Sequence, residues 1–330
     1  MHKRIYILVL FLLIGTSVFA QERPDRRARI IVDNDLCGDP DGLVALAQQV
    51  LCNTVNLRGI VGAHLNAGPM VSGNQADASV QKAQELLTVM GLSGRFTIVP
   101  GAAVPMSDSG KPIDSEGAQL IIREARACTP EQPLYLLMGG PLTDAASALL
   151  LAPDIAPNII LVWIGGQEYP FGHPQPWTGI SEVEYNLNLS IPSARYIFND
   201  SPVRLWQIPR DAYRQCLYSF ASWDRHIAPL GALGKYLDDA VCRWRDLGIG
   251  QEVYALGDSP LVLLSSMQTF FERDTASSDF VETAAPHITE SGSYDFSRPG
   301  RIVRVYTRID TALMFKDMED RLALHAIRNN

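Results

Sequence analysis

The 330-residue sequence predicts an α/β fold that is Rossmann-like, with a mostly parallel central sheet and helices on both of its faces. Two observations favour this class. Short stretches that are apolar at nearly every position alternate with longer stretches whose apolar residues recur at helical spacing. Strands that are apolar throughout are typical of a parallel sheet that is buried on both faces.

The elements follow in order from this alternation. Strands are predicted at 29–34, 56–64, 96–101, 133–140 and 158–166, and helices at 41–52, 79–91, 116–127 and 141–152. No Ser/Gly-rich linker, charge block or internal repeat interrupts the pattern. We therefore expect a single domain over residues 21–330.

Residues 1–20 have the features of a signal peptide. Lys3 and Arg4 precede the apolar run 5–14, and small residues at Val18 and Ala20 suit cleavage after Ala20. The apolar run is short for a membrane span. The sequence thus predicts an exported protein, periplasmic or secreted, with no membrane attachment after cleavage.

The charge balance narrows the class of partner. Without residues 1–20, 26 basic residues remain against 36 acidic ones, so the net charge is 26 − 36 = −10. An acidic chain without a basic stripe is a poor candidate for binding nucleic acid or anionic membranes.

The five cysteines are scattered without a CxxC pair, which predicts buried apolar thiols and no zinc site. Homo-oligomer formation stays open.

Carboxylates are concentrated directly after the first predicted strand. The stretch VDNDLCGDPDG holds four within nine positions: Asp33, Asp35, Asp39 and Asp41. Like charges this close raise one another's pKa unless a cation lies among them. In parallel sheets, ligands bind outside the carboxyl ends of the strands. The pattern therefore predicts a metal ion at this end of the first strand.

Three other interpretations of this stretch are weaker. An EF-hand loop would need oxygen ligands where Cys37 and Val44 stand. An aspartyl phosphotransferase needs a hydroxyl residue soon after the D-x-D pair, and Leu36 and Cys37 provide none. A solvated turn that caps the following helix would need only one of the four carboxylates.

The sequence resembles the calcium-dependent inosine–uridine nucleoside hydrolases over nearly the whole length that follows residue 20. VDNDLCGDPDGLVAL is similar to the opening motif of that family, D-x-D-x-G-x-D-D. The segments LRGIVGAHLNAG, LMGGPLTDAASAL, WIGG, VEYNLNLSIPSA, LGDSPLVLL and GRIVRVYTRIDTALMFKDMEDRL resemble later family segments in the same order. Each similarity is modest, and their order and spacing make the resemblance specific.

The resemblance implies hydrolysis of the N-glycosidic bond of ribonucleosides to ribose and free base, with a calcium-bound water as the nucleophile. Asp35 would be the general base and a metal ligand. The other implied metal ligands are Asp41, Asp258 and the carbonyl of Gly139. The implied contacts to the sugar come from Asp41, Asn66, Glu184 and Asn186. Each position also has a purely structural interpretation; Asp258, for example, suits a helix N-cap equally well.

Two departures from the family pattern affect the chemistry. Gly42 stands where the opening motif has its last aspartate, so one carboxylate ligand is missing, and Asp39 is the expected substitute. Gly257 stands where the family has a histidine that protonates the leaving base. We expect His173 to take that role, with His64 as the rival.

The segment 167–181 carries aromatic residues among prolines and glycines, which is unusual for a connecting loop. It is interpreted either as a lid, with Trp177 or Phe171 stacking on the nucleobase, or as an aromatic plug packed on the surface. The expected partner is thus a small nucleoside or another ribose-containing molecule. A second class of function stays open: a calcium-dependent sugar- or nucleoside-binding protein without this catalysis.

Overall fold

The computed structural model describes residues 27–65, 73–108, 110–171, 183–246, 252–267 and 277–329. Within them the main sheet has eight strands in the order β3-β2-β1-β4-β5-β6-β12-β9. Every neighbouring pair is parallel except β12 and β9. The strands are β1 (Ala28–Asn34), β2 (Val55–Gly62), β3 (Ile98–Pro100), β4 (Leu134–Met138), β5 (Ile159–Ile164), β6 (Arg204–Ile208), β9 (Asp279–Ala284) and β12 (Ile302–Arg308). The predicted mostly parallel α/β fold is confirmed.

The strand order predicts a ligand crevice between β1 and β4. The order 3-2-1-4-5-6 is that of doubly wound sheets, in which the direction of winding reverses between strands 1 and 4. Ligands bind at this reversal, outside the carboxyl ends of the two strands. The loop after β1 carries the aspartates, and Gly139 follows β4 directly. Topology alone thus brings these two segments together.

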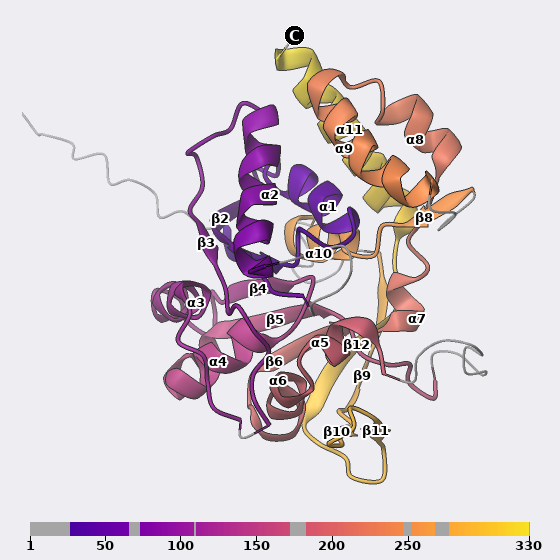
Figure 1. Cartoon of the computed structure of the whole chain (residues 1–330). Coiled ribbons are helices and arrows are strands. Elements are labelled where there is room, and N and C mark those ends of the chain that lie inside the picture. Colours follow the sequence, from indigo (N-terminus) through magenta and orange to yellow (C-terminus); the bar gives the residue numbers. More distant parts are fainter. Residues whose placement is uncertain are drawn as a thin grey trace, which may run out of the picture.

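Helices cover both faces of the sheet (Figure 1). One apolar cluster joins the sheet to helices that include α1, α2, α9, α10 and α11, and the other joins it to α3, α4 and α6. Successive residues of β1 point to opposite faces of the sheet. Ile30 and Val32 pack in the cluster with α1 and α2, and Ile31 packs in the cluster with α3 and α4. This double burial explains why β1 is apolar throughout. The helices are α1 (Asp41–Gln49), α2 (Gln75–Val89), α3 (Glu116–Arg126), α4 (Thr143–Leu151), α5 (Tyr185–Leu189), α6 (Ile191–Arg195), α7 (Arg210–Tyr213), α8 (Phe220–His226), α9 (Gly231–Asp246), α10 (Ser259–Ser266) and α11 (Thr311–Asn329).

The shorter elements complete the chain. They are the helical turns η1 (Pro153–Asn158) and η2 (Tyr196–Asp200), and the strand pairs β7 (Leu217–Ser219) with β8 (Val253–Ala255) and β10 (His287–Ile288) with β11 (Tyr294–Asp295). All five cysteines lie in the described part of the chain as free thiols, three of them buried. The predicted signal peptide lies outside the described residues. Among the helices that are described, none has the length and apolarity required to cross a bilayer.

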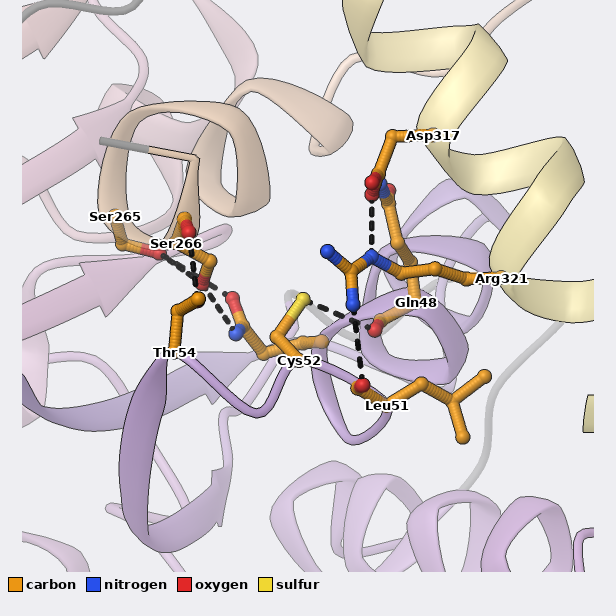
Figure 2. Close-up of polar contacts among 9 residues, drawn as sticks. Gln48, Leu51, Cys52, Thr54, Ser265, Ser266, Asp317 and Arg321 are labelled. Carbon is orange, nitrogen blue, oxygen red and sulfur yellow. Dashed lines mark hydrogen bonds and ion pairs between the residues drawn. The ribbon is translucent and has the colours of Figure 1, made fainter. Parts of the chain in front are cut away.

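Helices α1 and α10 run side by side, and both of their N-termini reach the crevice. At their C-terminal ends, Gln49 Nε2 donates to Ser266 Oγ at 2.8 Å, and Thr54 Oγ1 donates to the Ser266 carbonyl at 2.7 Å (Figure 2). At their N-terminal ends, the Asp258 N–H donates to Asp41 Oδ2 at 3.1 Å. Since the bonds join like ends, the two helices are held in the same direction.

Helix α11 also fixes the C-terminal end of α1. Asp317 accepts hydrogen bonds from Gln48 of α1 at 2.9 Å and from Arg321 at 2.5 Å, and Arg321 also donates to the Leu51 carbonyl at 3.2 Å (Figure 2). These contacts lie at the opposite end of α1 from Asp41. They stabilise the position of α1, which carries Asp41 at its N-terminus.

Candidate active site

Four carboxylates surround the crevice at the carboxyl end of β1. Asp35 and Asp39 belong to the loop after β1, Asp41 opens α1, and Asp258 precedes α10. Asp35, Asp41 and Asp258 are buried or nearly so, and Asp39 is exposed. The partial positive charges at the N-termini of α1 and α10 favour anionic groups at this place. The structure thus brings together the four side chains that the sequence predicted as metal ligands.

Asp258 does not act as a simple helix cap. It stands at the N-cap of α10, but its side chain makes no capping hydrogen bond to that helix. Its Oδ2 accepts instead from Asn34 Nδ2 at 2.8 Å. The carboxylate therefore points away from its own helix and toward the end of β1, which favours the ligand interpretation over the capping one.

The carboxylates of this cluster repel one another, and among the described residues no positively charged side chain belongs to the cluster. Burial and the charges of neighbouring carboxylates raise the pKa of Asp35 and of Asp41 well above the ordinary value. For Asp258, burial raises the pKa to about 8, a hydrogen bond from Asn34 opposes the shift, and Asp39 adds to it. A bound cation would remove this penalty, because it favours the charged form of each carboxyl group.

Gly139, which was predicted to offer its carbonyl oxygen, borders the crevice from β4. A Cβ on this residue would lie 2.2 Å from Asn34 Nδ2 and 2.8 Å from Asp258 Oδ2. Real Cβ atoms do not approach other heavy atoms so closely, so only glycine allows Asn34 and Asp258 to meet here.

We expect Gly139→Ala to separate Asn34 from Asp258 and to lower the free energy of unfolding by about 1–3 kcal/mol, as overpacking of a tight site does. Urea denaturation measures the change. Gly257→Ala is the matched control, because its Cβ would lie 3.2 Å from the flexible Asp41 Oδ2 and 3.4 Å from Tyr213 Cδ2. Equal stability of the two variants would contradict this steric explanation.

Glu184 and Asn186 lie at the start of α5, and Glu184 is close enough to Asp35 and Asp258 to act on the pKa of both. Asn186 Nδ2 donates to the carbonyls of Gly139 at 3.2 Å and Ile164 at 2.9 Å. It therefore joins the ends of β4 and β5 and contacts the carbonyl that was predicted to bind metal. The structure thus brings Asn186, a predicted sugar-binding residue, next to Gly139.

Glu184 is fully buried, and its carboxylate already has three donors. Oε2 accepts from the N–H groups of Gly166 at 2.8 Å and Leu187 at 3.0 Å, and Oε1 accepts from Tyr213 Oη at 2.9 Å. Burial raises the pKa of Glu184, and these hydrogen bonds oppose the shift. Its role in the structure is to cap α5 and to tie that helix to Gly166 and, through Tyr213, to α7.

The sequence did not single out Asn34, Tyr213 or Tyr254 as site residues. Asn34 lies between two of the aspartates and carries the bond to Asp258. Burial and the nearby carboxylates Asp39 and Asp41 raise the pKa of Tyr254. Asn34 could have been found from its place inside the D-x-D pair. The two tyrosines carry no local signal, because β7–β8 and α7 bring them in from distant parts of the chain.

Behind the crevice lies a second buried polar group that faces the α3 and α4 layer. Asp144 accepts from the Ala102 N–H at 2.9 Å and from the Ser115 hydroxyl, and burial raises its pKa to about 6. His64 is fully buried with Nε2 2.8 Å from Thr143 Oγ1, and burial lowers its pKa to about 4. A neutral, enclosed imidazole does not suit the role of leaving-group acid for which His64 was the rival.

Three predicted site residues, Asn66, His173 and Trp177, lie outside the described residues. The described start of the aromatic segment does pack on the protein. Tyr169 is buried, donates to Gln207 Oε1 at 2.7 Å and contacts the ring of Phe171, which is itself exposed. For this first part of the segment the plug interpretation fits the structure.

The donors around the crevice suit a hard cation. In the part of the chain that the structure describes, no three Asp, Glu, His or Cys side chains already form a group that could hold a metal ion. The donor set here is mixed: carboxylates, the Gly139 carbonyl and the amide oxygen of Asn34, which is buried without a hydrogen-bond partner among the described residues. Mixed oxygen donors are the ligands that calcium prefers.

Comparisons with known proteins agree with this architecture. No protein-family model and no curated sequence matches the chain. Solved structures do match. A purine-preferring ribonucleoside hydrolase from Gardnerella vaginalis has a TM-score of 0.66 at 16% identity, and the match covers 90% of this chain and 99% of that one. An inosine-uridine preferring nucleoside hydrolase from Bacillus anthracis has a TM-score of 0.65 at 16% identity, with the same coverage. A plant nucleoside hydrolase gives 0.65 at 15%, again over 90% and 99%. The chain therefore has the nucleoside hydrolase fold.

Proposed function

We propose that this protein hydrolyses the N-glycosidic bond of ribonucleosides. The observation that carries the proposal is the meeting of Asp35, Asp41 and Asp258 at the β1–β4 crevice of a nucleoside hydrolase fold. Cleavage of such a bond passes through an oxocarbenium-like transition state. The negative charge collected at this crevice stabilises a developing positive charge on the sugar.

One group of residues would hold the calcium ion and activate the water, and a second group would hold the sugar. Asp35 accepts the proton of the attacking water as the general base, and its neighbours Asp39, Asp41, Asp258 and the Gly139 carbonyl would hold a calcium ion with it. That ion, when bound, supplies positive charge that orients the sugar hydroxyls and makes a water easier to deprotonate.

The sugar would be held from both sides of the crevice. Asp41 offers carboxylate oxygens from the α1 side. Asn186 and Glu184 face it from the α5 side, and the bonds of Asn186 to two strand ends fix its orientation. Asn66 follows β2 and is proposed to complete these contacts.

His173 is proposed to protonate the departing base, because Gly257 provides no side chain for that step. We expect His173→Ala to slow the hydrolysis of inosine by about a hundredfold or more, the typical contribution of general acid catalysis. The same variant should cleave p-nitrophenyl riboside at nearly the wild-type rate, since that leaving group needs no proton. Steady-state kinetics on both substrates measures the difference, and equal slowing of both would reject the assignment.

Trp177→Ala should raise the KM for inosine if this segment closes over the base.

A calcium-dependent binding protein is the second candidate function. Two observations favour it: Gly257 lacks the acid, and the Glu184 carboxylate is already hydrogen-bonded on both oxygens. Release of free ribose from inosine, uridine, adenosine and cytidine, measured with and without calcium, separates the two. Calcium-dependent release supports hydrolysis, whereas tight inosine binding without release supports the binding protein.

We further propose that the protein is exported, on the basis of its apolar leader. The N-terminal sequence of the protein from the producing cells should then begin at Gln21, and a retained Met1 would contradict export by cleavage.

A further inference from the structure

Asn34 occupies a cradle that exists because two neighbouring residues are glycine. A Cβ on Gly42 would lie 2.9 Å from Asn34 Oδ1 and 3.1 Å from its Cγ, and a Cβ on Gly139 would lie 2.2 Å from Nδ2. The amide therefore fills the space in which side chains at 42 and 139 would begin. Asn34 is 1% exposed, so the fit is enclosed.

The two ends of this amide have different surroundings. Nδ2 donates to Asp258 Oδ2 at 2.8 Å, which sets the orientation of the group, because a carboxylate oxygen is an acceptor. Oδ1 is buried and has no hydrogen-bond partner among the described residues. A buried carbonyl oxygen without a partner is costly, so such an atom calls for a ligand.

We infer that Asn34 supplies, through Oδ1, the metal ligand that the chain lacks at Gly42. This inference rests on the calcium site of the proposed function. The amide lies at the place where a residue-42 side chain would leave the backbone, and amide oxygens are ordinary calcium ligands. The amide oxygen of Asn34 then takes the place of the carboxylate oxygen that is missing at residue 42.

Asp39 is the competing substitute, and the structure favours Asn34 over it. Asp39 is exposed, and the three atoms nearest to a Cβ at residue 42 all belong to Asn34 rather than to Asp39. Asn34 is enclosed, contacts the space at Gly42 directly and already bonds the ligand Asp258. Replacing a carboxylate by a neutral amide also lowers the negative charge that the folded crevice must accommodate before calcium binds.

The experiment measures calcium affinity by isothermal titration calorimetry on the whole folded protein, so that it does not depend on turnover. Asn34→Ala should weaken calcium binding at least about tenfold. Asn158→Ala is the matched control: its amide donates to the Ala125 carbonyl at 3.1 Å on another part of the protein, and its calcium affinity should equal that of the wild type. Asp39→Asn should have a smaller effect than Asn34→Ala.

A second pair of variants keeps the test decisive if Asn34→Ala folds poorly. Asn34→Asp adds a carboxylate beside Asp258, so it should lower the Tm in EDTA and increase the rise in Tm on adding calcium chloride. Gly42→Asp should lower the Tm with Asn34 present, whereas the double variant Asn34→Ala with Gly42→Asp should recover calcium affinity.

The outcomes separate this inference from the proposed function. Unchanged calcium affinity in Asn34→Ala, with a loss in Asp39→Asn, would overturn the role of Asn34 and leave the calcium site in place. A wild-type protein that binds no calcium in calorimetry and gains no Tm from it would overturn both.

Discussion

Asp35→Asn is expected to reduce nucleoside hydrolysis by at least about a thousandfold, the upper part of the range for loss of a general base. Asp35 is 9% exposed at the end of β1, and its carboxylate lies among those of Asp39 and Asp258. An asparagine has nearly the same shape but accepts no proton near neutral pH. The variant also loses one charge toward calcium, so its metal affinity should fall with its kcat.

Asp144→Asn is the matched control for this substitution. Asp144 is also buried with a raised pKa, but it faces Ala102 and Ser115 behind the crevice. It should keep hydrolysis within about threefold of the wild type, a change of about 0.7 kcal/mol in the activation free energy, because its hydrogen bonds go to Ala102 and Ser115 and not to Asp35, Asp41 or Asp258. Ribose release measured at saturating inosine and calcium tests both variants. Asp35→Asn with a wild-type kcat would remove Asp35 from the mechanism.

The metal-free protein is expected to lose stability as the pH rises from about 4 to about 8. Burial raises the pKa of Asp258 from 3.8 to about 8, so in this window the folded state holds a proton that the unfolded state has released. By linkage, the free energy of unfolding then falls with rising pH, by up to about 1.4 kcal/mol per pH unit for each such carboxyl group. Asp35 and Asp41 shift in the same direction and act in the same sense.

Calcium should reverse this dependence, because it binds the deprotonated carboxylates. The rise in Tm on adding calcium should therefore be larger at pH 8 than at pH 5. Thermal unfolding in EDTA and in calcium chloride at both pH values measures it. Asp258→Asn is the control and should flatten the slope in EDTA. An EDTA-treated protein that is more stable at pH 8 than at pH 5 would contradict the electrostatic account.

Much of the fold followed from the sequence because its signals are local. The apolar stretch of β1 and the helical spacing of α1 each report burial over a few residues, and every strand and helix predicted up to residue 166 is present, with bounds that differ by a few residues. The aspartates could be placed at one edge because parallel strands present their carboxyl ends together. The concentration of carboxylates at that edge could likewise be read from the residue types.

The tertiary structure alone decided which atoms meet. Whether Asp258 caps α10 or faces the crevice depends on the contact of α1 with α10, which Gln49 and Ser266 hold at the other end. The rival His64 is set aside by its burial against Thr143, which no local pattern reports. Asn34 has an ordinary place in the sequence, and it gains its role because Gly42 and Gly139, more than ninety residues apart, leave room for one amide. Residue types are fixed by the chain, but contacts between distant residues depend on strand register and helix packing, and these set the final arrangement of the site.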